Sequence, residues 1–564
     1  MRLQLIATIG LAVIGLAGQA GAQTVKSGTI SADETWCGTA NPGPIILAGP
    51  VVVGDGTNAG TPNFTDKATL TILPGCVVRG QPRTAAGAAG APGSLTVSRS
   101  GRLIANGQAT NTTVIVMTTA ATDNDSDGNP DRDSITGALE AWESGDLFWD
   151  ADPQNLPMAP LDASGAGTVQ LWGGLIVLGS APVNIGAGCV PATEGLCNVE
   201  GLALPGVVTA DQATYGGQLP HDSSGEISYI SIRHGGDQIG TANEINGITM
   251  AGVGDGTEFH HIEVYANFDD GIEWFGGTVN GDHLHVFAVG DDAVDTDQGY
   301  TGVNQFVFAV APWFGELGGG LYGSASGDKL GELDGDDASS SRGATINCRP
   351  RSSVQFWNVT GLGSKGPVSG QEFTPTAGND AGVSNNRGMQ YRNGFGGSVQ
   401  NSVIANTYGQ GIDVSTDTSA CTGNATSDQV AACSTYAMAV TQSNVAAVGS
   451  SEQAALDCGD SSSRVTCPGT GCNVVNPSFG FGIVNSDQSF NPQGDANGNL
   501  VASLKTTPLN PELTGFSGTV GGATPSTGAL LDRTATYRGA FDSSLSTLWV
   551  DGWTVLSIAG LIDN

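Results

Sequence analysis

Basic residues are scarce in this chain. Only 20 Lys and Arg stand against 54 Asp and Glu, and the formal net charge is −34. Such an excess of negative charge repels nucleic acid and anionic lipid, so nucleic-acid binding is excluded as a function. The same excess favours solubility and association with divalent cations. The sequence therefore predicts an acidic protein that attracts cations.

Long apolar segments are also absent. After the N-terminus no stretch reaches the roughly 18 apolar residues that a membrane helix needs, so we expect no membrane span. The first 22 residues contain one arginine, a short apolar run and the sequence Ala20-Gly21-Ala22, which is typical of a secretory signal peptide cleaved before Gln23. No cysteine follows that site, so no lipid anchor is expected there. We expect a secreted protein of the medium, the cell surface or the periplasm.

Paired C-x-x-C spacings, which zinc sites use, are absent as well. The ten cysteines form an even set, which in an exported protein favours disulfide bonds. Cys189 with Cys197 and Cys421 with Cys433 are close enough in sequence to be short-loop pairs, and the full connectivity stays open. No nucleophile elbow, phosphate loop or dinucleotide fingerprint occurs in a suitable context.

Glycine and strand-forming residues are abundant instead. The 86 glycines, with many Thr, Val, Ser and Asn, favour short strands joined by tight turns. Segments 259–265, 283–289 and 304–310 alternate apolar and polar residues as strands do. Their apolar positions repeat at a spacing of 22, and one longer coil precedes them; the aligned positions are Ile262, Leu284 and Phe306, then Val264, Val286 and Phe308, with Ile230 and Ile232 earlier.

This fixed period predicts the fold class, which is all-β, a right-handed parallel β-helix. An antiparallel sandwich would need frequent two-residue turns and would not impose a period. We expect a signal peptide at 1–22, strand-rich N-terminal coils and a cap at 23–169, the β-helix core at 170–417, a cysteine-rich insertion at 418–475 and a C-terminal coil and cap at 476–564. The alanine-rich stretches 427–448 and 451–457 predict helices in that insertion. The aromatic-rich tail 531–556 suits a segment that packs back as a cap.

An aspartate-rich loop is the sharpest local motif. In TDNDSDGNPDRD (122–133), alternate carboxylates on a glycine-containing turn are suited to Ca²⁺. The predicted ligands are Asp123, Asp125, Asp127 and Asp131. The twelfth position is Ser134 rather than Glu, so this is not an ordinary EF-hand; the loop resembles the calcium repeats of thrombospondin-type or adhesin-type modules. The alternative is a solvated acidic turn.

A second acidic motif recurs after 22 positions. The repeat places Asp269 over Asp291, Asp270 over Asp292, and Glu273 over Asp295, with neighbouring coils about 4.8 Å apart. At an effective dielectric constant near 20, each such pair would repel by roughly 3 kcal/mol. Three explanations stay open. The turn recurs and its backbone N–H groups donate to the carboxylates, or a cation binds these five aspartates, or the cluster is catalytic.

The catalytic alternative has a specific form. The spacing of FDDGIE and GDDAVD resembles polygalacturonase-type glycoside hydrolases, and the resemblance implies Asp270, Asp291 and Asp292 as active-site carboxylates. The chain lacks that family's Gly-His-Gly and Arg-Ile-Lys segments. A pectate-lyase-like reaction would need calcium and a basic side chain, for which Arg233 is the nearest candidate.

Aromatic and histidine side chains supply the other candidate contacts. Trp274 is either a platform for a sugar ring or an apolar plug under a turn. Four histidines lie on consecutive coils, with His261 over His283, and strand alternation turns them outward. A metal or substrate role and simple stacking both fit them. Arg233, Trp274 and His283 are therefore the predicted substrate-binding residues.

Long motifs in a fixed order give a family resemblance over most of the chain. WGGLIVLGSAPVN (172–184), SSGEISYISIRHGG (223–236), DDGIEWFGGTVN (269–280), DDAVDTDQGYTGVNQF (291–306) and YRGAFD (537–542) resemble a widespread family of secreted bacterial proteins. Its members are labelled hypothetical secreted proteins or lipoproteins, or, misleadingly, multidrug transporters. The resemblance implies a right-handed parallel β-helix outside the cell and carries no activity with it.

These observations predict a calcium-stabilised, disulfide-bonded β-helix with a binding or structural role toward a polysaccharide or a cell-envelope or matrix component. The alternative is a polysaccharide hydrolase or lyase that uses the stacked aspartates.

Overall fold

The computed structural model describes most of the chain up to residue 310 and shorter pieces beyond it. The predicted signal peptide and much of 363–531 lie outside the described residues. The described residues are 23–57, 67–83, 91–125, 130–131, 139–140, 142–144, 146–150, 169–184, 196–199, 202, 207–240, 243–310, 329–334, 350, 352–362, 387–392, 395, 397–400, 402–407, 412–414, 439–441, 444–447, 456–458, 473–474, 532–535, 539–542, 545–558 and 562.

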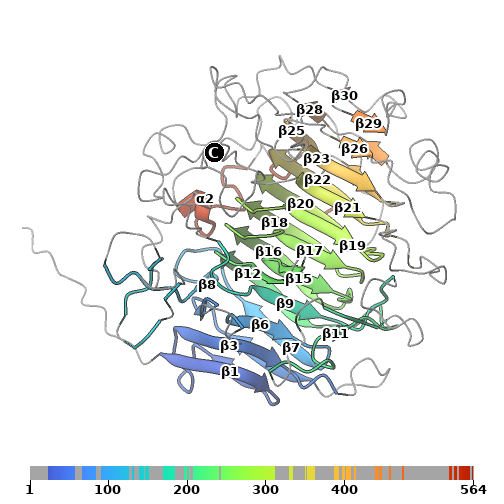
Figure 1. Ribbon diagram of the computed structural model, residues 1–564. Coiled ribbons are helices and arrows are strands. Elements are labelled where there is room, and N and C mark those ends of the chain that lie inside the picture. Colours follow the sequence, from blue (N-terminus) through green and yellow to red (C-terminus); the bar gives the residue numbers. More distant parts are fainter. Residues whose placement is uncertain are drawn as a thin grey trace, which may run out of the picture.

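Parallel strands stack into a solenoid with three ladders (Figure 1). The first ladder contains β2 (Glu34–Trp36), β4 (Ala68–Ile72), β7 (Gly101–Asn106), the first halves of β12 (Gly225–Arg233), β16 (Glu258–Tyr265), β18 (Gly281–Phe287), β20 (Val303–Val310) and β22 (Gln355–Leu362), then β24 (Ser398–Gln400) and β27 (Ala439–Thr441). The second contains the first halves of β1 (Thr24–Ile30) and β3 (Ile45–Val53), β5 (Val77–Gly80), β8 (Ile115–Thr119), the second halves of β12, β16, β18, β20 and β22, then β25 (Val403–Thr407), β28 (Asn444–Ala447) and β30 (Asn473–Val474).

The third ladder contains the second halves of β1 and β3, then β6 (Ser94–Val97), β9 (Leu175–Leu178), β15 (Ile248–Ala251), β17 (Ile272–Phe275), β19 (Val294–Asp297), β21 (Lys329–Asp334), β23 (Arg387–Arg392), β26 (Ile412–Val414) and β29 (Leu456–Cys458). The all-β parallel β-helix predicted from the 22-residue period is confirmed. None of the helices in the described part of the chain has the length and hydropathy to cross a bilayer.

The predicted register holds for two coils and then shifts. Ile262 pairs with Leu284 as expected. Leu284 pairs with Val307 rather than with Phe306, because the next coil is one residue longer. The fixed period of 22 is therefore wrong at this step, and the extra residue moves Phe306 out of the apolar column.

Phe306 instead joins a row of residues at the corner between the first and second ladders. Tyr229, His261, His283, Phe306 and Asn358 all have φ between 48° and 58°. This left-handed conformation is uncommon for residues other than glycine, although Asn and His adopt it more readily than most. It bends each long strand from one ladder into the next. The rings of Tyr229, His261, His283 and Phe306 contact one another in a column, which we call the corner column.

Apolar columns fill the interior of the solenoid. On the third ladder, Ile248, Ile272 and Val294 are in register, and all three are fully buried. Full burial of a large apolar side chain stabilises a fold by about 1.5–3 kcal/mol. The strands' second set of alternating residues, which includes Thr249 and Glu273, faces outward and carries the chemistry described below.

The segment 418–475 differs from its prediction. Its described residues form β27, β28, β29 and β30, which pair in parallel with the preceding coils and continue the solenoid. The expected helices are therefore corrected to strands at these residues. Pairing with the open edge of the last coil outweighs the helix preference of alanine, which is weak without packing. Cys421 and Cys433 lie outside the described residues.

The C-terminal segment, defined here as the described residues of 532–558, packs back on the solenoid. It lies against the side of the coils rather than on the last one (Figure 1). Asp532 contacts β20, Ala540 donates its N–H to Thr360 of β22 (2.8 Å), and Val555 donates to Glu263 of β16 (2.6 Å). Val555 begins the short helix α2 (Val555–Ile558).

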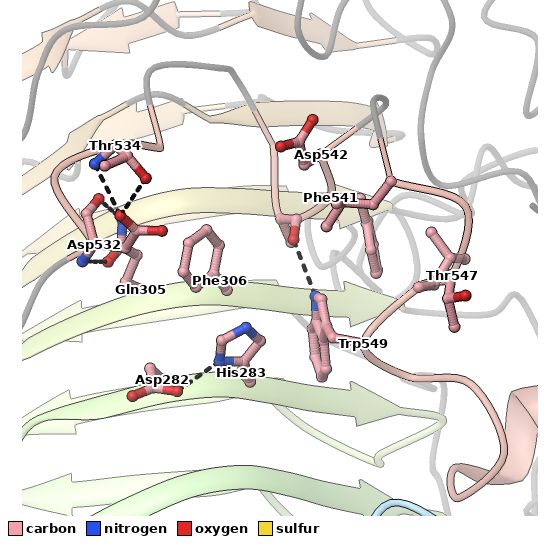
Figure 2. A pocket seen from close by; sticks show the side chains of 13 residues that line it. Asp282, His283, Gln305, Phe306, Asp532, Thr534, Phe541, Asp542, Thr547 and Trp549 are labelled. Atoms are coloured by element: carbon pink, nitrogen blue, oxygen red, sulfur yellow. Dashed lines mark hydrogen bonds and ion pairs between the residues drawn. The ribbon is translucent and has the colours of Figure 1, made fainter.

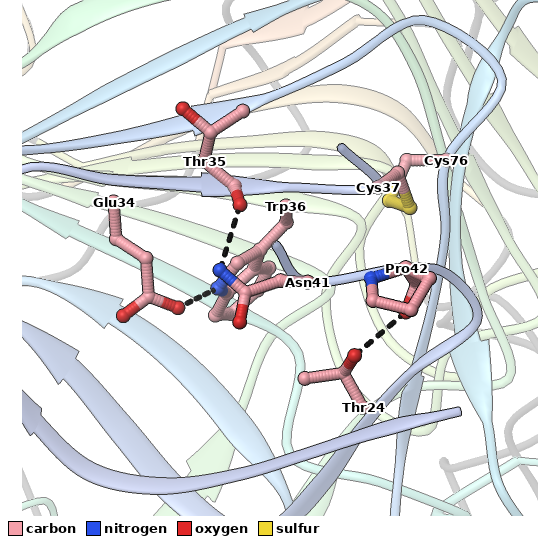
Figure 3. Close-up of a disulfide and its surroundings, with 8 residues drawn as sticks. All are labelled: Thr24, Glu34, Thr35, Trp36, Cys37, Asn41, Pro42 and Cys76. Carbon is pink, nitrogen blue, oxygen red and sulfur yellow. Dashed lines mark hydrogen bonds between the residues drawn. A yellow bond between two sulfur atoms is a disulfide. The ribbon is translucent and has the colours of Figure 1, made fainter. Parts of the chain in front are cut away.

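A disulfide joins Cys37 to Cys76 in the N-terminal coils (Figure 3). It lies next to the buried Trp36, whose Nε1–H donates to Glu34 (2.6 Å). Cys197 is also disulfide-bonded. Cys189 lies outside the described residues, so the pair Cys189–Cys197 stays a prediction.

Candidate functional site

Acidic side chains follow one another along the outward face of the third ladder. Glu273, Asp295 and Glu332 are in register on β17, β19 and β21, and we call them the acidic ladder. Thr249 precedes them on β15 and Gln390 follows on β23. The predicted stacking of Glu273 over Asp295 is confirmed, at the coil spacing of about 4.8 Å.

The turn that enters each of these strands also repeats. The backbone N–H of Asp292 donates to Asp270 Oδ1 (2.8 Å), and that of Gly271 donates to the carbonyl of Asp292 (2.9 Å). Asn267 Nδ2 donates to the carbonyl of Asp270 (2.8 Å). Backbone donors of a recurring turn therefore account for the proximity of Asp270 and Asp292, which was one of the three explanations.

A buried lysine offsets part of the negative charge. Lys329 is 7% exposed, and its Nζ lies 3.4 Å from Asp292 Oδ2 and in contact with Glu332 Oε2. Its positive charge therefore lies at the end of the acidic ladder formed by β19 and β21.

The β17 end is where the carboxyl groups are most perturbed. Burial, followed by the nearby Glu244 and Asp292, raises the pKa of Asp269 to about 7. Burial, followed by Asp269 and Asp295, raises the pKa of Asp270 well above its usual range. Burial, followed by Asp295 and Asp269, does the same for Glu273. These three groups resist ionisation unless a cation joins them.

A cavity of about 180 Å³ adjoins these three carboxyl groups. Its other walls come from β9, β15 and β14 (Asn243–Ile245), which pairs with β13 (Asp237–Gly240), and Val199 and Leu202 also line it. Asn246, which is 2% exposed, also lines it. Its Nδ2 donates to Glu273 and to Thr249 Oγ1 (3.2 Å), while its Oδ1 has no hydrogen-bond partner among the described residues.

Three groups of carboxylates on this face bring oxygens within 4.8 Å of one another. They are Asp269 with Asp270 and Asp291, Asp270 with Glu273 and Asp295, and Asp292 with Asp295 and Glu332. The structure thus brings together all five aspartates predicted from the repeat. Sequence reasoning missed Asn246, Lys329 and Glu332. The coil that carries Lys329 and Glu332 is longer than 22 residues, so the repeat gave no signal for them.

The aspartate-rich loop also gathers its carboxylates. Asp123, Asp125 and Asp131 bring oxygens within 4.8 Å of one another, while Asp127 lies outside the described residues. The N–H of Asp131 donates to the carbonyl of Thr122 (2.8 Å), which closes the loop. Burial raises the pKa of Asp131, and Asp125 and Asp123 add to this.

Two predicted substrate contacts are corrected by their placement. Arg233 is 3% exposed, and its Nε donates to Ser231 Oγ (2.7 Å), so it belongs to a buried polar network rather than to a surface. Trp274 is fully buried and stacks on Tyr300 with ring centroids 5.3 Å apart, which makes it the interior plug. Trp274 lies in register with the fully buried Met250, so strand alternation points both side chains into the interior.

His283, the third predicted contact, lines a groove of about 360 Å³ between the corner column and the C-terminal segment (Figure 2). Its ring stacks on His261 at 4.2 Å, which confirms the predicted stacking. The rings are only partly exposed, because Trp549 packs edge-on against His283 at 5.1 Å.

A family model, the pectate-lyase-like β-helix domain, matches residues 162–480. The chain belongs to this family. The matched range covers β9 to β30 and includes the acidic ladder, the cavity and His283. The comparisons with curated proteins and with solved structures gave no significant match.

Proposed function

We propose that the protein is an exported calcium-binding β-helix whose acidic ladder binds an acidic polysaccharide through calcium. The observation that carries this proposal is the crowding of Asp269, Asp270 and Glu273 around one cavity, with raised pKa values, beside an amide oxygen of Asn246 that has no described partner. Carboxylate and amide oxygens are the ligands that Ca²⁺ prefers. The residues present therefore fit a calcium ion.

The size of the cavity favours an ion over a sugar ring. Sites for small organic ligands are usually about 300–1,000 Å³, whereas this cavity is about 180 Å³. Asp291 is exposed at the rim, so a polysaccharide carboxylate would reach a bound calcium from outside. Bridging calcium also removes the repulsion between a polyanion and a chain with a net charge of −34.

Calcium titration by calorimetry and binding to immobilised polygalacturonate, each with and without chelator, test this function. We expect Glu273→Gln to weaken calcium binding at the acidic ladder and to reduce polygalacturonate retention at least tenfold. Asp125→Asn, in the separate aspartate-rich loop, tests whether that loop holds a second, structural calcium. Unchanged retention of the wild-type protein in chelator would contradict the proposal.

A polysaccharide hydrolase or lyase is the second candidate function. One observation favours it, namely the pKa of about 7 for Asp269, which would let this carboxyl act as a proton donor or acceptor near neutral pH. Asp270 and Asp292, by contrast, are 6% and 3% exposed. An assay for new reducing ends and unsaturated products over a polysaccharide panel, repeated with Asp292→Asn, separates the two functions. Activity that this variant abolishes would establish the enzyme.

A further inference from the structure

The groove in Figure 2 is a second site, separate from the acidic ladder. One wall is the corner column, with His283 and Phe306, and the other is the C-terminal segment, with Phe541 and Trp549. Phe541 and Trp549 stack with ring centroids 5.6 Å apart. At about 360 Å³ the groove is within the usual range for a small organic ligand.

Contacts on both walls fix the shape of the groove. Gln305 of β20 accepts the N–H of Asp532 (2.8 Å) and donates to its carbonyl (3.2 Å). Trp549 Nε1–H donates to the carbonyl of Ala540 (3.0 Å). The N–H of Ala540 in turn donates to Thr360 Oγ1. The aromatic wall is therefore positioned before any ligand arrives, which lowers the entropic cost of binding.

Carboxylates surround the aromatic wall. Asp282, Asp532 and Asp542 line the groove, and none of its described lining residues is Lys or Arg. Burial raises the pKa of Asp282, but the hydrogen bond from His283 and the nearby histidines outweigh it, so this pKa is below its usual value. Asp532 Oδ1 accepts the N–H (2.8 Å) and the hydroxyl (2.6 Å) of Thr534, which fixes its carboxylate at the rim.

We propose that this groove binds an amino sugar, with its ammonium group among the carboxylates and its ring against Trp549 and Phe306. Aromatic rings attract the apolar face of a sugar and, through their negative faces, a cation. Carboxylates supply charge-assisted hydrogen bonds to the ammonium group and accept hydroxyl protons. Three carboxylates without a lysine or arginine among the described lining residues attract an ammonium group and repel an acidic sugar, while a neutral sugar gains no such attraction.

Calorimetric titration with a glucosamine trimer, and with its N-acetylated form as a probe of equal length without charge, tests the proposal. The buffer contains chelator, so that calcium at the acidic ladder plays no part. The pH is held near 5.5. We expect the glucosamine trimer to bind at one site per chain and the N-acetylated trimer at least tenfold more weakly.

Three variants locate the site. Asp282→Asn with Asp542→Asn removes two groove charges at nearly constant shape and should weaken binding of the glucosamine trimer at least tenfold. Thr547→Arg, at an exposed rim position, should do the same without touching the core. Glu258→Gln, an exposed change outside the groove, is the matched control and should leave binding unchanged.

Equal binding of the two trimers would overturn the proposal, because the ammonium group would then contribute nothing. Wild-type affinity in both groove variants would also overturn it, since attraction would then come from the net charge of the whole chain. Because the test is run in chelator, loss of calcium-dependent polygalacturonate binding has no bearing on its outcome.

Discussion

His261 illustrates how the corner column sets the chemistry of single residues. Its ring lies between Tyr229 at 4.3 Å and His283 at 4.2 Å, with Trp553 nearby. Burial, followed by the proximity of His283 and His260, lowers the pKa of His261 to about 3. The imidazole therefore stays neutral in the folded protein at pH values where the unfolded chain already carries the proton.

This shift predicts acid sensitivity. The unfolded state binds a proton near pH 6.5 and the folded state only near pH 3, so the free energy of unfolding falls as the pH drops between these values. One such group contributes up to about 1.4 kcal/mol per pH unit. We expect His261→Asn, which tolerates the left-handed backbone, to flatten this dependence in urea unfolding at several pH values. The exposed His221→Asn is the control, and an equal effect of both variants would contradict the prediction.

Glu273 carries the opposite pH dependence. Its pKa is raised, so its contribution to stability is complete below about pH 4 and is lost as the pH rises through the raised value. We expect Glu273→Gln to increase the free energy of unfolding at pH 8 in chelator by about 1–3 kcal/mol, because it removes a stacked like charge. At pH 4 the variant and the wild type should be equally stable.

The same variant should lose the rise in melting temperature that calcium gives the wild type. Glu258→Gln removes a charge from an exposed position on β16 and should change neither quantity. A destabilised Glu273→Gln at pH 8 would show that the carboxylate is not crowded in solution.

At the scale of elements, the C-terminal segment is held by a buried carboxylate. Glu263 is fully buried; its Oε1 accepts the N–H of Val555 at the start of α2, and its Oε2 accepts the hydroxyl of Ser231 (2.5 Å). Arg233 donates to the same hydroxyl. The residue predicted to bind substrate therefore helps to fix the segment that forms one wall of the groove.

Val555→Pro tests this attachment. Proline is accepted at the first position of a helix, so the change removes chiefly the N–H that Glu263 accepts. We expect a loss of about 1–3 kcal/mol, because a buried acceptor loses its donor. Val555→Ala keeps the N–H and is the control for the smaller side chain. Differential scanning calorimetry measures both, and equal melting temperatures would show that the hydrogen bond contributes nothing.

At the scale of the molecule, each coil of the solenoid contacts mainly its neighbours, so stability is local along the axis. The disulfide Cys37–Cys76 joins residues 39 positions apart in the N-terminal coils. By restricting the unfolded chain, a disulfide that closes a loop of this size raises the free energy of unfolding by about 3–4 kcal/mol.

We expect the double variant Cys37→Ala with Cys76→Ala to speed hydrogen exchange in β1 to β5 while β18 and β20 keep their protection. Uniform acceleration along the whole solenoid would show instead that the coils unfold as a single unit.

The strand pattern made the fold predictable, because interior and exterior residues alternate with a period of two and coils recur near 22 residues. The 22-residue spacing failed where coils have other lengths. The coil that leads to Phe306 is one residue longer, so the spacing placed Phe306 wrongly, and the coil that carries Glu332 is longer still, so the spacing did not place Glu332.

The sequence by itself determined the parallel β-helix and the stacking of Glu273 on Asp295, because both follow from local repetition along the chain. Only the tertiary structure decided that Asn246 and Lys329 join the acidic residues and that the C-terminal segment covers the corner column. These contacts join residues far apart in sequence, and no local pattern records which outward side chains a distant segment will cover. The Asp-Asp repeat thus indicates a recurring turn in the sequence, while in the structure its first pair, Asp269 and Asp270, lines a cavity.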